Sequence, residues 1–255
     1  MGQRLGSRWR MRMTKFAILL LGLISADGAA AQDADWTYKA TIYGWFPGMS
    51  SSVDTRFGTV EADSSSSDAL SDLDMAFMGS FSAQYGRWAF IGDLLYSDLS
   101  SSQDTPFALY GDGTVDVKTT AISGYVLYRV VENPQMLLDL GAGFRHFDVD
   151  VDVALSPGRR PAASQSFNGS WTDPLIAARL SVPINDNWFL SGFADWGGSG
   201  GDDETWQIYA GVGYAFDEKW STQFGYRHME ISKELDGPDM SIGMGGPVLA
   251  LTYNF

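Results

Sequence analysis

The feature that most constrains the fold of this chain is an alternation of apolar and polar side chains with a period of two residues. In "WTYKATIYGW", Trp36, Tyr38 and Ile42 share one face, and Lys39 and Thr41 share the other. The pattern returns in short segments up to the C-terminus. Such alternation predicts β-strands whose two faces meet different surroundings. The sequence therefore predicts an all-β protein.

Short and long connections alternate between these segments. Ten strands are predicted, approximately at 36–45, 75–86, 88–97, 115–131, 136–152, 168–183, 188–197, 204–216, 220–233 and 244–255. Tight links at 86–87, 132–135, 184–187 and 217–219 alternate with longer polar stretches at 47–73, 98–114, 153–167, 197–203 and 233–243. An even strand number with sorted connections is typical of a bacterial outer-membrane barrel with periplasmic turns and extracellular loops. We expect a transmembrane antiparallel up-and-down β-barrel of about ten strands, with eight as an alternative.

The N-terminal segment has the pattern of an export signal. Five basic residues precede the apolar run "FAILLLGLI" at 16–24, and small residues end at Ala31. The run is shorter than the roughly 20 apolar residues of a membrane-spanning helix. The sequence predicts a signal peptide at 1–31, an outer-membrane β-barrel domain at 32–255, and an N-terminus in the periplasm.

Composition excludes several function classes. The net charge of −14 does not favour nucleic acid as a partner. The chain has no cysteine, so disulfides, thiolate metal sites and thiol nucleophiles are excluded. We expect no cofactor and no bound metal, and the oligomeric state is open.

The C-terminal strand explains how such a sheet would close. Leu249 and Leu251 share the predicted lipid face, whereas Val248 and Ala250 face inward. Backbone groups in hydrocarbon must all be hydrogen-bonded, so the last strand has to pair with the first. An alternating last strand that ends on Phe255 also resembles the signal by which barrel proteins are recognised for insertion, which implies the barrel-assembly machinery as a partner. Outer-membrane lipid and lipopolysaccharide are the other expected partners.

Aromatic residues gather at the turn side of the predicted strands. A membrane-interface girdle is expected there. Its predicted members are Trp36, Trp88, Trp188, Trp220, Tyr253 and Phe255.

Several segments carry a family resemblance. They are "IYGWFPG", "LSDLDMAFMGSF", "WTDPLIAARLSVPINDNWFLSGFADWGGSG", "TWQIYAGVGYAF" and "WSTQFGYRHMEI". The chain resembles uncharacterised proteobacterial outer-membrane β-barrel proteins over nearly all of 36–255. The resemblance implies a barrel and brings no catalytic assignment with it.

Charged residues share the face opposite to the aromatic one and predict an ion-pair network in the lumen. Asp139 and Arg179 are expected at one level with Lys39, Arg145 with Asp173 above them, and Asp195 with Arg227. Buried charges need partners. The functional interpretation is a selectivity filter for a small pore, and the structural one is a polar plug, which we favour because barrels of about eight strands have little room inside. The full set is Lys39, Asp93, Asp139, Arg145, Asp173, Arg179, Asp195 and Arg227.

The histidines supply the only enzyme hypothesis. His146 and His228 fall toward the extracellular ends of strands, and His228 with Asp202 and Asp203 is reminiscent of the omptin proteases. A lipid A-modifying arrangement is weaker still. Acidic segments such as "DVDVDV" at 148–153 offer Ca²⁺ or Mg²⁺ ligands, but solvated loops are the favoured explanation.

We therefore expect a non-enzymatic outer-membrane barrel with a plugged lumen and a structural or surface-interacting role. A narrow channel for small polar solutes is the alternative, and a rim-active protease or lipid A-modifying enzyme is the weaker one.

Overall fold

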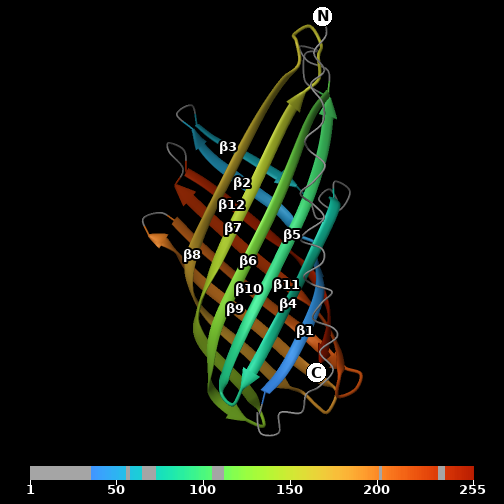
Figure 1. Ribbon diagram of the computed structural model, residues 1–255, viewed down its shortest axis with the longest axis vertical. Coiled ribbons are helices and arrows are strands. Elements are labelled where there is room, and N and C mark those ends of the chain that lie inside the picture. Colours follow the sequence, from blue (N-terminus) through green and yellow to red (C-terminus); the bar gives the residue numbers. More distant parts are fainter. Residues whose placement is uncertain (1–35, 56–57, 65–72, 105–111, 201–202, 235–238) are drawn as a thin grey trace, which may run out of the picture. The chain divides into compact units, whose positions relative to one another are not determined.

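The computed structural model describes residues 36–55, 58–64, 73–104, 112–200, 203–234 and 239–255 (Figure 1). The expected signal peptide at 1–31 lies outside these residues. Among the residues that are described, no helix is long and apolar enough to cross a membrane.

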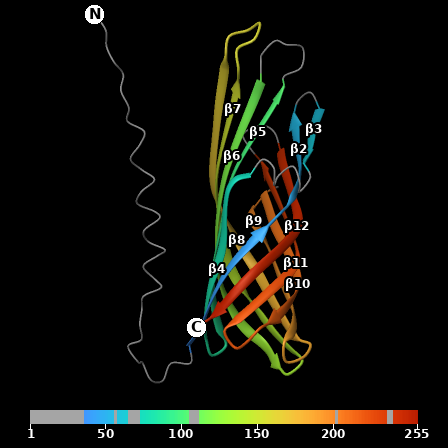
Figure 2. The same ribbon diagram turned by 90° about the vertical axis from the view of Figure 1, so that its right-hand side faces the viewer.

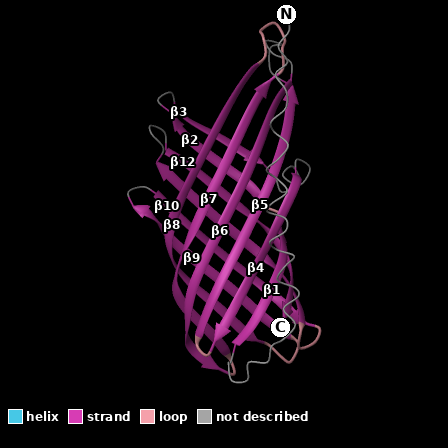
Figure 3. Ribbon diagram, in the orientation of Figure 1, coloured by secondary structure: helices cyan, strands magenta, loops and turns pink. Residues whose placement is uncertain are grey.

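Every element of the described part of the chain is a β-strand (Figure 3). The strands are β1 (Trp36–Trp45), β2 (Gly48–Thr55), β3 (Gly58–Ser64), β4 (Leu73–Tyr85), β5 (Trp88–Asp104), β6 (Asp112–Asn133), β7 (Met136–Leu155), β8 (Ala163–Pro183), β9 (Trp188–Gly200), β10 (Asp203–Ala215), β11 (Trp220–Glu234) and β12 (Asp239–Asn254).

Ten of these strands form a closed antiparallel barrel. Their order around the ring is β1, then β4 to β12 in sequence, and β12 returns to β1. The closing pair runs from Lys39 opposite Asn254 to Trp45 opposite Val248. The predicted closure of the last strand on the first is therefore confirmed, as is the ten-strand barrel.

The predicted loop at 47–73 is wrong in part, because it contains the hairpin β2–β3. β2 pairs with the upper part of β12, from Gly48 opposite Gly245 to Val53 opposite Met240. β1 and β2 therefore both pair with β12, and only Phe46 and Pro47 separate the two strands along the chain. The segment "SSSVDT" has no alternating apolar face, so a prediction from periodicity could not recognise this strand.

Strands also continue into the other four predicted loops, and two of these show it most clearly. β5 continues to Asp104 and β7 to Leu155, where 98–114 and 153–167 were predicted to be loops. β6 has 22 residues, about twice the 9–11 residues that cross a bilayer. The strands β5 to β8 thus form a sheet that continues past the ring of the other strands (Figure 2). The hairpin expected from "TVDVK" and "FDVDVDV" is confirmed by the pairing of β6 with β7.

The two faces of the barrel wall differ as the alternation predicted. On β12, Leu249 is 57% exposed, whereas its neighbours Val248 and Ala250 are only 6% and 8% exposed. Large apolar side chains such as Ile176 and Phe224 are likewise exposed on the outer face. An outer surface of this kind suits hydrocarbon rather than water.

Candidate functional site in the barrel lumen

The charged side chains of the lumen are arranged in levels along the barrel. At the level nearest the short turns, Arg179 Nε donates to Asp139 Oδ2 at 2.9 Å, across the register pair that these two residues form. Arg129 Nε donates to the other oxygen, Asp139 Oδ1, at 3.0 Å. Sequence reasoning missed Arg129, although it shares the inward parity of Tyr125 on β6. Lys39, expected at this level, lines the same cavity but has no hydrogen-bond or ion-pair partner among the described residues.

The middle level is an ion pair that joins β7 to β9 over the inner face of β8. Arg145 Nη2 lies 2.6 Å from Asp195 Oδ2, and both side chains are fully buried. Arg145 stands opposite Asp173 in the β7–β8 register, so the expected neighbours are adjacent but are not each other's partner. The hydroxyl of Tyr125 donates to the same Asp195 oxygen at 2.8 Å.

A glycine creates the space for Tyr125. A Cβ atom on Gly143 would lie 2.5 Å from the Tyr125 ring, well inside van der Waals contact. The absent side chain lets the ring lie against the barrel wall and brings its hydroxyl to Asp195. Gly143 is uncharged, but it allows Tyr125 to reach the buried Asp195 carboxylate.

Arg227 and Asp93 are linked through a tyrosine. The Tyr43 hydroxyl donates to Asp93, with oxygens at 2.9 and 3.0 Å, and Arg227 Nη1 donates to Tyr43 at 3.3 Å. The guanidinium carbon of Arg227 also lies 4.7 Å from the centre of the Trp45 ring. The expected pair of Arg227 with Asp195 is not formed, because Asp195 is occupied by Arg145.

The uppermost level is built around Lys233, which sequence reasoning also missed. Its amine lies 2.9 Å from Asp173 and 2.9 Å from Asp203. Lys233 is the last residue of the predicted strand 220–233 and has the parity of Arg227, so the inward pattern could have found it.

An apolar layer fills the lumen between the middle and upper levels. The side chains at this level are therefore apolar, where a polar plug was expected. The buried members of this layer, which we call the apolar seal, are Trp45, Met78, Leu95, Ala121, Phe147, Met229, Ile231 and Val248. A signal for it exists in the sequence, since Trp45, Leu95 and Met229 each stand two residues beyond a polar lumen residue and thus share its face.

Below the apolar seal, the lumen contains a cavity of about 370 Å³. Thr37 and Gln84, close to the chain start of β1 and to the first short turn, line it at one end. Tyr43, Asp93 and Arg227 line it at the other end, directly beneath the seal. The cavity is therefore confined to the short-turn half of the barrel.

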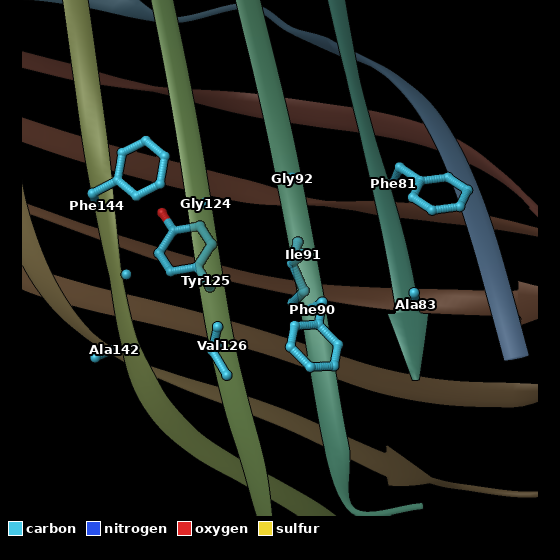
Figure 4. Close-up of a pocket in the computed structure, with 11 residues that line it drawn as sticks. Phe81, Ala83, Phe90, Ile91, Gly92, Gly124, Tyr125, Val126, Ala142 and Phe144 are labelled. Atoms are coloured by element: carbon cyan, nitrogen blue, oxygen red, sulfur yellow. The ribbon is translucent and has the colours of Figure 1, made fainter. Parts of the chain in front are cut away.

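A second hollow lies on the outer wall and is apolar. Phe81, Phe90 and Phe144 flank Gly92 and Gly124 on the neighbouring strands β4 to β7 (Figure 4). Its polar lining is almost absent, which fits contact with lipid chains.

Aromatic pairs mark the short-turn end of the barrel. Three tryptophans that begin strands lie opposite a tyrosine on the next strand, with ring centroids 5.0 Å apart: Trp36 with Tyr85, Trp88 with Tyr128 and Trp188 with Tyr214. The pair of Trp220 with Tyr253 is at 4.8 Å, and Tyr253 contacts Phe255 at 4.9 Å. The six aromatics expected in a girdle thus lie at one end of the barrel, each in contact with another aromatic ring.

The rim site of the weaker enzyme hypothesis lies only partly within the described residues. His228 lies on the outer face, with its ring 5.0 Å from Trp206, whereas Asp203 is bound to Lys233 in the interior. Asp202 lies outside the described residues. His146 contacts the hydroxyl of Thr172 at 2.8 Å. His228 Nε2 lies 4.0 Å from Glu230 Oε2. Among the described residues, neither histidine contacts both a carboxylate and a hydroxyl group.

The acidic strands do not gather metal ligands in the described ranges. Asp116 stands opposite Asp152, and Lys118 stands opposite Asp150. No group of three or more His, Asp or Glu side chains there is placed to hold a metal ion.

Of three solved structures similar to this chain, one agrees with this fold at a TM-score above 0.5. The outer membrane protease OmpT from Escherichia coli has a TM-score of 0.62 at 9% identity, covering 87% of this chain and 97% of that one. Ail, the attachment invasion locus protein of Yersinia pestis, has a TM-score of 0.34 at 13% identity, covering 88% and 100%. The toluene transporter TodX of P. putida has a TM-score of 0.36 at 8% identity, covering 88% and 90%. A search among proteins of curated function returned no match.

A closed antiparallel barrel with an apolar outer wall and a charged interior defines an integral β-barrel of the bacterial outer membrane. The sequence matches the family described as "Outer membrane protein beta-barrel domain" over residues 16–255. The chain belongs to this family.

Proposed function

We propose that the protein is a non-conducting, non-enzymatic outer-membrane barrel that presents its long strands at the cell surface. The observation that carries the proposal is the apolar seal, in which Phe147 and Met229 are only 2% and 1% exposed. A packed apolar layer disfavours the passage of hydrated ions, and the buried pair of Arg145 with Asp195 narrows the lumen below it.

The proposed orientation places the short turns and the N-terminus in the periplasm. The girdle of Trp36 and its counterparts would then lie at the periplasmic interface. The strands β5 to β8 would extend from the membrane into the medium, with Asp148, Asp150 and Asp152 on one face. This acidic sheet is the proposed interaction surface, and lipopolysaccharide bridged by divalent cations is its proposed partner. The strand that ends at Phe255 is the proposed signal for the barrel-assembly machinery.

A narrow channel remains the second candidate, and the cavity below the seal favours it. The two candidates differ in conductance across a planar lipid bilayer. We expect no discrete steps from the purified protein. A Phe147→Ala/Met229→Ala variant, which removes two large side chains from the seal, is expected to produce them. Reproducible steps from the unmodified protein, with an ion preference that changes in Arg227→Ala, would contradict the proposal and support the channel.

A further inference from the structure

The short-turn end of the lumen carries an excess of positive charge in an acidic protein. Lys39, Arg129 and Arg179 line the cavity there together with one carboxylate, Asp139. Near this end, Arg129 also lies 3.6 Å from Glu132, but Glu132 is half exposed and is shared with Arg87 at 3.8 Å. The nearby set therefore retains more cations than anions, although the whole chain has a net charge of −14.

Lys39 is the cation that is left over. Both arginines use their guanidinium groups to hold the buried Asp139. The Lys39 amine has no such partner in the described part of the chain, and the groups that act on it electrostatically are Arg129 and Arg179. Placing a third cation beside two others is unfavourable unless an anion joins them. The three side chains thus form a positively charged mouth of the cavity.

The inner end of the cavity carries polar groups that lack partners. Arg227 Nε is a buried donor without a hydrogen bond, and Gln207 Oε1 is a buried acceptor without one. Both residues line the same cavity. Buried polar groups are almost always hydrogen-bonded in folded proteins, so water or a ligand is expected to satisfy them. A hydroxyl group both accepts and donates, and it suits this donor and acceptor together.

The walls between the two ends carry hydroxyl groups among apolar side chains. Ser80, Ser82, Ser191 and Thr41 line the cavity between the mouth and Arg227. A volume of about 370 Å³ lies within the range of pockets that bind small molecules, roughly 300–1,000 Å³. The seal closes the far end, so a solute that enters here has to leave by the same route.

From this arrangement we infer that the cavity binds a small phosphorylated polyol, with its phosphate at Lys39 and its hydroxyl groups toward Gln207 and Arg227. The ammonium of Lys39 and the adjacent guanidinium groups supply charge-assisted hydrogen bonds to the phosphate. The site is independent of the acidic surface sheet, and it exists whether or not the protein interacts with other cell-surface molecules.

The experiment is isothermal titration of the full chain in a non-ionic detergent with glucose 1-phosphate, inorganic phosphate and glucose. We expect glucose 1-phosphate to bind most tightly of the three. Its affinity should fall as ionic strength rises. Lys39→Gln is expected to weaken binding of glucose 1-phosphate about tenfold or more, as the loss of one charge-assisted contact predicts. Lys39 is chosen because it holds no other described group, so its replacement leaves the Asp139 cluster intact.

Lys118→Gln is the matched control. Lys118 lies toward the opposite end of the barrel, 3.6 Å from Asp98 and half exposed, so this variant loses the same charge outside the cavity. Its affinity should equal that of the unmodified protein. Absence of binding at a ligand concentration of about 10 mM would overturn the inference. A Kd of about 10 mM corresponds to a binding free energy of roughly −3 kcal/mol. Equal binding of glucose and glucose 1-phosphate, or equal losses in Lys39→Gln and Lys118→Gln, would overturn it too.

Discussion

Arg145 on β7 and Asp195 on β9 are joined by an ion pair of 2.6 Å that skips the strand between them. Both side chains are completely removed from solvent. Tyr125 and Gln207 add hydrogen bonds to the same carboxylate oxygen, Asp195 Oδ2. The pair ties β7 to β9 across the inner face of β8, directly beneath the apolar seal.

Replacing one member of this pair is expected to be costly. Arg145→Met leaves the Asp195 carboxylate buried without its counter-ion, and the free energy of unfolding should fall by about 3–5 kcal/mol. The double variant Arg145→Met/Asp195→Leu removes both charges and should recover most of that loss. Urea unfolding in lipid vesicles measures both. A single variant as stable as the unmodified protein would show that the pair contributes nothing.

The cost of placing a charged side chain on the outer wall should depend on its depth in the membrane. Ile176 is 62% exposed on β8 and Ile184 is 55% exposed in the adjacent short turn. Ile176→Arg should destabilise the folded barrel by about 2–4 kcal/mol, because it places a charge in hydrocarbon, whereas Ile184→Arg at the interface should cost about 0–1 kcal/mol. The same vesicle unfolding assay applies. Equal effects from the two isoleucines would contradict the assignment of the wall to the membrane interior.

Each aromatic pair at the short-turn end should contribute separately to the stability of the folded barrel. Trp220 and Tyr253 lie opposite each other with ring centroids 4.8 Å apart. A double-mutant cycle of Trp220→Ala and Tyr253→Ala is expected to give a coupling energy of about 0.5–1.5 kcal/mol. Trp88→Ala combined with Tyr253→Ala is the control, since these residues belong to different pairs and should be additive. A coupling energy of zero for the first pair would mean that the contact is not formed.

The two faces of the barrel wall were predictable from sequence, because alternate side chains of a strand point inward and outward and differ in polarity. The outward Leu249 and the inward Val248 follow from parity alone. The hairpin β2–β3 was not predictable in this way, because the segment around Ser51 and Ser52 has no apolar face in its sequence.

The partners within the lumen were harder to predict than its lining. Strand register places Arg145 beside Asp173, but a long arginine side chain can reach past the adjacent strand to Asp195. Lys233 then reaches Asp173 from another strand. Such contacts depend on strand tilt and on side-chain length, which linear spacing does not contain. Phe147 has the parity of Arg145, so the apolar seal lies on the same face of the strands as the predicted charged residues.

The closed lumen is tested most directly by the reactivity of a single introduced cysteine, since the chain has none of its own. Ser82 lines the cavity below the seal, and Ser170 lies exposed on β8 beyond it. Intact cells that lack general porins are treated with a small, charged, membrane-impermeant thiol reagent. Ser170→Cys should react at once, and Ser82→Cys should react only after the outer membrane is permeabilised. Equally fast reaction of both cysteines in intact cells would contradict a sealed barrel.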